Sequence, residues 1–288
     1  MRGMVGQVMR LIHVSLAEPD GQVSGRELRD AANYGDMIRT DTVIQFFIDD
    51  FLYQKRVKGE PPTVVTISQR AIGDLMHEIE QIKPDGMVFE GVALLQAIEA
   101  VRKRYPSLPI AVDFHNVEGA LYRELRDARF PWLLRPIFRW LMASRYRAVD
   151  IADRRVVALA NMVWVCSDDD RKSVLAFAPT SDVVTIANPI PDWGRQEYPS
   201  PVGPRLDVLF VGHLGYAPNK FAVRFLANRL RPLLMKRLPQ AQLHVCGRNP
   251  SRKLVQFLRS RGVKVTENPA TLVQIYNAAA VAAIPLRH

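Results

Sequence analysis

The sequence contains little cysteine and no long apolar run. Cys166 and Cys246 are the two cysteines among 288 residues, and both lie in apolar segments typical of buried strands. This excludes the disulfide framework of a small secreted protein and favours a reducing compartment. No apolar run reaches the ~18–20 residues needed to cross a bilayer, and Gln7 and Arg10 interrupt the only candidate signal-peptide core. We therefore expect a cytoplasmic protein.

The sequence also lacks the ligand and motif spacings of zinc fingers, RNA-binding motifs and basic zippers. Its formal net charge is nevertheless +10, with a pI of about 9.8. Such a charge indicates an anionic partner, which can be nucleic acid, a membrane surface or a phosphorylated ligand. Because acidic residues are interspersed and no recognition module is present, we expect no nucleic-acid partner.

Residues 129–147 contain no acidic side chain, and their arginines alternate with Trp132, Trp140 and other apolar residues. A basic, aromatic-rich amphipathic stretch suits the interface of an anionic membrane, at the inner face for a cytoplasmic protein. A helix that packs on its own domain, with arginines extending outward, explains the same pattern. Both interpretations stay open at this point.

Strands and helices alternate along most of the chain, which predicts parallel sheets joined by right-handed crossovers. Five prolines between Pro189 and Pro204 indicate a linker. We therefore expect an N-terminal α/β domain over 1–188, a linker over 189–204 and a C-terminal domain over 205–288. The predicted strands are 11–16, 42–48, 63–67, 87–89, 110–114, 163–166, 183–186, 207–211, 242–246, 263–266 and 281–284. The predicted helices are 26–39, 72–82, 93–104, 220–238, 251–261 and 270–278.

The C-terminal domain begins with a strand at 207–211 that ends at Gly212 and leads into a helix near Asn219 and Lys220. A strand, a glycine and a helix start can present backbone N–H groups to a phosphate, although tight turns without ligands share this pattern. We expect Asn219 to cap the helix. Lys220 opposes the helix dipole, and a bound anion beside it would relieve that conflict.

Two further motifs follow predicted strands. His115 comes directly after strand 110–114. From the residues alone, a hydrogen-bonded loop histidine is a simpler interpretation of His115 than an active-site residue. Ser167 precedes Asp168, Asp169 and Asp170, whose spacing fits a D-x-D metal motif but fits helix capping better, because Ser167 is a good N-cap.

Three segments together resemble a known family: DFHNVEG at 113–119, TIANPIPD at 185–192 and VLFVGHLGYAPNK at 208–220. Over roughly residues 85–288 the chain resembles the retaining GT-B glycosyltransferases of family 4 (group 1), particularly exopolysaccharide-type sugar transferases. The resemblance implies two Rossmann-like domains facing across a cleft, with the donor bound at the C-terminal domain.

The resemblance assigns roles to eight residues. His115 would lie at the reaction centre and contact the donor sugar. Gly21 and Gly25 would belong to a loop facing the acceptor and the diphosphate. Among the remaining five, His213 stands where the family often has arginine. These five would bind the nucleotide-sugar: Gly212, His213, Lys220, Gly247 and Arg248.

The implied activity is transfer of a sugar, with retention, from a nucleotide-diphosphate-sugar to a lipid-linked or glycan acceptor. No metal and no other cofactor are expected, because Lys220 and the helix dipole supply the positive field. The sequence stops at His288, before the family's glycine-rich loop and paired glutamates, so we expect an incomplete second domain. A nucleotide-sugar epimerase of the same fold and an inactive remnant are the alternatives.

Overall fold

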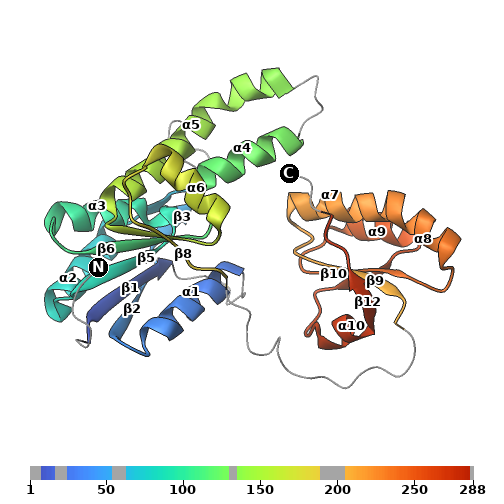
Figure 1. Cartoon of the computed structure of the whole chain (residues 1–288), viewed down its shortest axis with the longest axis horizontal. Helices are drawn as coiled ribbons and strands as arrows, with labels where there is room; N and C mark the ends of the chain where they lie inside the picture. The colour runs from blue at the N-terminus through green and yellow to red at the C-terminus, as the bar shows by residue number, and fades with distance from the viewer. Residues whose placement is uncertain (1–7, 17–24, 54–62, 130–134, 189–204, 286–288) are drawn as a thin grey trace. The chain divides into compact units, whose positions relative to one another are not determined.

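The computed structural model describes residues 8–16, 25–53, 63–129, 135–188 and 205–285 (Figure 1). The chain divides into two compact units, residues 1–190 and 191–288. The predicted linker, 189–204, lies outside the described residues. Among the helices described, none is both long and apolar enough to span a bilayer.

The first unit contains a six-stranded sheet in the order β2-β1-β5-β6-β7-β8, with every neighbouring pair parallel. β1, β5 and β6 are buried along almost their whole length, as expected of central parallel strands covered on both faces. Every strand predicted for this sheet is present. The strands are β1 (Arg10–Leu16), β2 (Thr42–Ile48), β5 (Gly86–Glu90), β6 (Ile110–Phe114), β7 (Met162–Val165) and β8 (Val183–Thr185).

Helices cover both faces of this sheet. α1 lies on one face (Figure 1), whereas α2 packs against α3 and shares one hydrophobic core with α3, α5 and α6 on the other. A small antiparallel pair, β3 (Phe51–Tyr53) with β4 (Val65–Ile67), lies outside the main sheet, and β3 was not predicted. The helical segments are α1 (Gly25–Met37), α2 (Gln69–Ile82), η1 (Val92–Leu94), α3 (Leu95–Arg104), α4 (Glu118–Arg129), α5 (Arg135–Leu159) and α6 (Asp168–Phe177).

The order of the strands creates a switch point between β1 and β5. From β1 the chain adds β2 on one side, whereas β5, β6, β7 and β8 follow on the other. Connections leave in opposite directions at such a point, which opens a crevice at the carboxyl ends of the strands. Polar side chains at the ends of β5 and β6 therefore lie where a ligand is expected.

The second unit contains a four-stranded parallel sheet in the order β11-β10-β9-β12. Right-handed crossovers from β9 to β10 and from β10 to β11 run in one direction, so their helices share a face, and α10 lies on the other (Figure 1). The elements are β9 (Asp207–Val211), α7 (Ala217–Phe225), η4 (Leu226–Leu230), α8 (Arg231–Arg237), β10 (Leu243–Gly247), α9 (Arg252–Ser260), β11 (Lys264–Glu267), α10 (Val273–Ala278) and β12 (Ala279–Ala282).

The segment from α7 to α8 is continuously helical but irregular. A π-helical turn, η4, ends two residues before Pro232. Proline has no N–H to donate to the preceding turn, and a wider turn accommodates that loss. The helix predicted over 220–238 with a break at Pro232 is thus present, and it begins three residues earlier.

The basic stretch 129–147 is divided between the end of α4 and the first half of α5. The second half of α5 packs into the core through Val149, Ala152 and Val156, which are all buried. In the first half, by contrast, Ile137 is 57% exposed and Trp140 is 78% exposed. These two side chains do not pack on the described part of their own unit.

Candidate functional site

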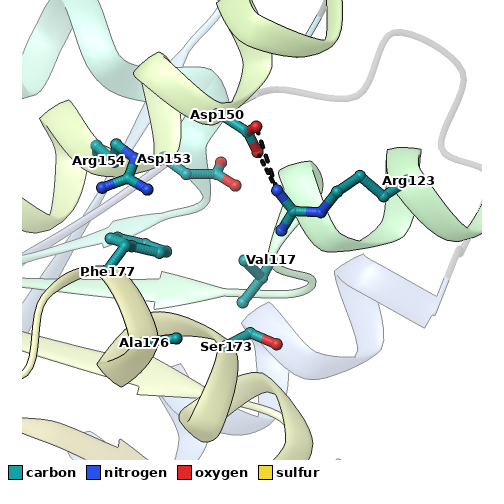
Figure 2. Close-up of a pocket in the computed structure, with 8 residues that line it drawn as sticks. All are labelled: Val117, Arg123, Asp150, Asp153, Arg154, Ser173, Ala176 and Phe177. Carbon is teal, nitrogen blue, oxygen red and sulfur yellow. Dashed lines mark hydrogen bonds and ion pairs between the residues drawn. The ribbon is translucent and has the colours of Figure 1, made fainter. Parts of the chain in front are cut away.

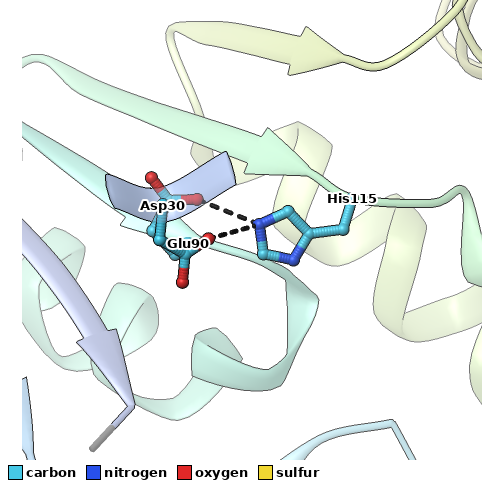
Figure 3. A group of neighbouring side chains, drawn as sticks. All are labelled: Asp30, Glu90 and His115. Carbon is cyan, nitrogen blue, oxygen red and sulfur yellow. Dashed lines mark hydrogen bonds and ion pairs between the residues drawn. The ribbon is translucent and has the colours of Figure 1, made fainter. Parts of the chain in front are cut away.

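His115 lies at the carboxyl end of β6 and is enclosed by carboxylates from three different elements. Its Nε2 is 2.8 Å from Asp30 Oδ1 on α1 and 3.1 Å from Glu90 Oε2 at the end of β5 (Figure 3). Asp113 Oδ2 on β6 is 3.6 Å away. Gly91 has a φ of 90°, which suits glycine and turns the chain beneath the ring. The switch point therefore brings these side chains together.

A second group of buried side chains holds these carboxylates. Arg29 donates from Nε and Nη2 to the two oxygens of Asp113, each at 2.6 Å, and from Nη1 to the carbonyl of Ile186 at 2.7 Å. Asn33 Nδ2 donates to Asp113 Oδ2 at 3.0 Å. A carboxylate with this many donors has a fixed orientation, so the edge of the sheet is rigid.

Glu90 forms the link between β1 and β5. Its Oε1 lies 2.6 Å from Nε2 of His13, and both side chains are fully buried. Burial raises the pKa of Glu90, but hydrogen bonds from His115 and His13 outweigh this and hold the pKa well below its usual range. Glu90 is therefore a permanent anion beneath His115.

The charge state of His115 follows from these neighbours. Burial lowers the pKa of His115, but hydrogen bonds to Asp30 and Glu90 outweigh burial and raise the pKa to about 9. At neutral pH the ring is thus an imidazolium, with its Nε2 proton held by carboxylates. Its Nδ1 makes no hydrogen bond within the described residues, and 16% of the side chain is exposed. His115 can donate through Nδ1 but cannot act as a base at neutral pH.

The same three side chains are spaced to reach a metal ion. One ligand atom from each of Asp30, Glu90 and His115 lies within 4.8 Å of the others. A metal would have to displace the Nε2 proton, because histidine binds metals in its neutral form. The raised pKa of His115 therefore favours the proton over the metal at this position.

The predicted glycine loop after β1 is only partly described. Gly21 lies outside the described residues, and Gly25 is the first residue of α1. Gly25 therefore belongs to the helix that carries Arg29 and Asp30, rather than to the loop in which it was predicted.

In the second unit, four of the five predicted nucleotide-binding residues lie where the chain leaves β9 and β10, and these two segments contact each other. Gly212 donates its N–H to the carbonyl of Cys246 at 3.1 Å, and Leu214 donates to the carbonyl of Arg248 at 2.8 Å. The ring of His213 lies 3.1 Å from Asn249 Nδ2. These bonds join the loops after β9 and β10 at the carboxyl edge of the sheet.

Glycine is required at position 247, because the contact leaves no space for a side chain. A Cβ at Gly247 would lie 1.8 Å from the carbonyl oxygen of Gly212, so only glycine allows the two backbones to approach. The fifth residue, Lys220, is in the first turn of α7, and its N–H donates to the carbonyl of Tyr216. The glycine turn and the helix start thus adjoin each other as predicted.

Two capping predictions have different outcomes. The prediction that Asn219 caps α7 is wrong: Tyr216 occupies that position without a side-chain bond, and Asn219 Nδ2 reaches back from the helix to the carbonyl of His213. The capping prediction for Ser167 is confirmed, because its Oγ accepts the N–H of Asp170 at 3.1 Å.

A cavity of about 230 Å³ lies between α4, α5 and α6 in the first unit (Figure 2). Asp153 is 1% exposed and accepts the N–H of Gly119 at 2.7 Å. Burial raises the pKa of Asp153 to about 7. None of the sequence-predicted site residues lines this cavity, and its walls come mainly from helices. The lining residues are Val117, Arg123, Asp150, Asp153, Arg154, Ser173, Ala176 and Phe177.

Sequence reasoning missed the partners of His115. Asp30 and Arg29 lie on a polar helix, and Glu90 ends a short apolar strand. The available signal was the position of Glu90 and Asp113, because each places a carboxylate at or next to the carboxyl end of a predicted central strand.

Comparisons with known proteins agree with this architecture. Sucrose-phosphate synthase from Thermosynechococcus elongatus is 13% identical with a TM-score of 0.60, over 97% of this chain and 76% of that one. Starch synthase IV from Arabidopsis thaliana, bound to ADP and acarbose, is 13% identical with a TM-score of 0.57, over 97% and 78%.

A third similar structure is the UDP-GlcNAc 2-epimerase from Neisseria meningitidis bound to UDP-GlcNAc. It is 14% identical with a TM-score of 0.53, over 95% of this chain and 77% of that one. No curated protein matches by sequence. Residues 205–288 match the family described as glycosyl transferases group 1. The solved structures thus show a GT-B fold, and the similarity to group 1 glycosyltransferases is found in the C-terminal unit.

Proposed function

We propose that the protein transfers a sugar, with retention of configuration, from a nucleotide-diphosphate-sugar to a lipid-linked or glycan acceptor without a metal. The observation that carries this proposal is the pair of joined loops after β9 and β10. Gly247 approaches the backbone of Gly212 there more closely than a residue with a Cβ could, and α7 begins shortly after Gly212. A backbone cradle beside a helix N-terminus suits a diphosphate.

The leaving diphosphate gains negative charge as its bond to the sugar breaks, through an oxocarbenium-like state. Groups already oriented toward that charge lower the barrier. In this proposal they are the N–H groups after Gly212, the N-terminus of α7 and the ammonium of Lys220. These groups take the role that a divalent cation has in other transferases.

His115 acts as a hydrogen-bond donor to the donor sugar. As an imidazolium held by Asp30 and Glu90 it has no free lone pair, so it does not remove the proton of the acceptor hydroxyl. That proton goes to the departing phosphate oxygen as the acceptor oxygen bonds to the same face of the sugar carbon. This same-face route accounts for retention without a carboxylate nucleophile.

The acceptor side of the proposal includes a membrane. The exposed Ile137 and Trp140 on the first half of α5, with Arg145 and Arg147 also exposed, form an apolar and basic surface. Such a surface suits the interface of an anionic bilayer. We place the protein peripherally at the cytoplasmic face, where a lipid-linked acceptor would be presented.

The test is a screen of UDP-, GDP- and ADP-sugars for acceptor-dependent release of nucleoside diphosphate. Lys220→Ala should lower turnover by orders of magnitude, and turnover at the wild-type rate in this variant would refute the role of Lys220. The epimerase alternative is supported if sugar isomers interconvert without any acceptor. Donor turnover that leaves the anomeric configuration of the product inverted would contradict the retaining mechanism.

A further inference from the structure

The positive charge of the chain is concentrated in its second unit. Between Asp207 and Glu267 the sequence has 59 residues with 12 lysines and arginines and no acidic residue. The rest of the chain has 27 basic and 29 acidic side chains, so it is close to neutral. The net charge of +10 therefore arises from the second unit, and this unit is expected to have an anionic partner of its own.

Most of these cations lie on one face of the unit. The helices α7, η4, α8 and α9 share the face opposite α10 (Figure 1), and α7 packs against α9. We call their outer surface the basic layer. Its cationic residues are Arg224, Arg229, Arg231, Lys236, Arg237, Arg252, Lys253, Arg259 and Arg261.

Some of these side chains have structural contacts. Arg231 donates to the carbonyl of Gly262 at 3.1 Å, Arg259 pairs with Glu267, and Arg224 and Arg261 lie over the ring of Phe257.

The other five are exposed and form no ion pair within the described part of the unit. They are Arg229, Lys236, Arg237, Arg252 and Lys253. Keeping like charges together costs free energy, so a layer without countercharges indicates an anionic partner.

Large apolar side chains stand among these cations. Phe221 on α7 is 53% exposed and Leu233 on α8 is 61% exposed. Leu238, directly after α8, is 43% exposed. Aliphatic and aromatic side chains mixed with arginine and lysine can enter the headgroup region of a bilayer, whereas nucleic-acid backbones offer nothing for leucine to contact.

We propose that the basic layer is a docking surface for an anionic lipid bilayer. Its cations would contact lipid phosphates, and Phe221 and Leu233 would insert between the headgroups. This surface is separate from the first half of α5, which belongs to the other unit. The proposal does not depend on sugar transfer, because it concerns binding alone.

The test is co-sedimentation of the full chain with phosphatidylcholine vesicles that contain or lack phosphatidylglycerol. Binding should require the anionic lipid and should weaken as salt is added. A variant with Arg229→Gln, Lys236→Gln and Lys253→Gln should bind about 100-fold more weakly, since each cation near an anionic surface contributes about fivefold.

The matched control removes three exposed cations of the first unit, with Arg39→Gln, Lys103→Gln and Lys172→Gln, and should bind nearly as the wild type does. Equal melting temperatures will show that both variants fold. Three results would each overturn the proposal: equal binding to both kinds of vesicle, wild-type affinity in the first variant, or tighter retention on duplex DNA than on anionic vesicles. Nucleotide titrations with the same variants separate this outcome from a failure of the proposed catalytic function.

Discussion

The charge of His115 is the most direct consequence of the carboxylate cluster at the switch point. The ordinary pKa of histidine is near 6.5, and here hydrogen bonds to Asp30 and Glu90 overcome burial and raise it to about 9. This difference corresponds to about 3 kcal/mol in favour of the imidazolium. Because the folded-state pKa is raised, this stabilisation is complete below pH 6.5 and is lost as pH rises through 9.

The perturbation is Asp30→Asn, which keeps the shape of the side chain and removes the charge of one of the two carboxylates that accept from His115 Nε2. We expect the pKa of His115 to fall measurably. Proton NMR of the imidazole during a pH titration measures this pKa. Asp36→Asn is the control, because Asp36 is on the same helix but is 77% exposed. A wild-type midpoint near 6.5 would contradict the account, and so would an unchanged midpoint in Asp30→Asn.

Three further variants test other parts of the structure. Asp153→Asn should stabilise the protein at pH 8 by up to about 4 kcal/mol and have little effect at pH 4. The reason is that burial raises the pKa of the Asp153 carboxyl to about 7. Denaturant unfolding at both pH values measures the change in stability. Gly247→Ala should abolish nucleotide binding in titration calorimetry, since its Cβ would overlap Gly212, whereas Gly73→Ala has free space in α2 and should bind as wild type. Arg29→Met should cost about 3–5 kcal/mol in urea unfolding, because it leaves a buried carboxylate unpaired, and a cost below 1 kcal/mol would contradict the ion-pair assignment.

The fold was predictable because its signals are local. Strands such as 110–114 and 207–211 are apolar runs bounded by polar or glycine residues, and their alternation with helices implies parallel sheets. The turn at Gly212 was recognisable for the same reason. The close contact between Gly247 and Gly212 was not, since it depends on the pairing of β9 with β10.

The partners of His115 could not be predicted from local patterns. Arg29 and Asp113 are separated by 84 positions, and only the sheet order brings α1 over the end of β6. The role of Asn219 was mistaken because residues after glycine fit several turn geometries, and the helix begins at Ala217. The uneven charge was visible in the sequence, but its concentration on one face depends on the handedness of the crossovers.

Titration calorimetry with UDP, GDP and ADP tests the central claim most directly, that the joined loops after β9 and β10 hold a diphosphate. We predict that at least one of these nucleotides binds the wild-type chain. Lys220→Ala should weaken that binding by about 10–100-fold, the usual contribution of a charged hydrogen bond. Wild-type affinity in Lys220→Ala, or heats at the level of buffer dilution for all three nucleotides, would contradict the account.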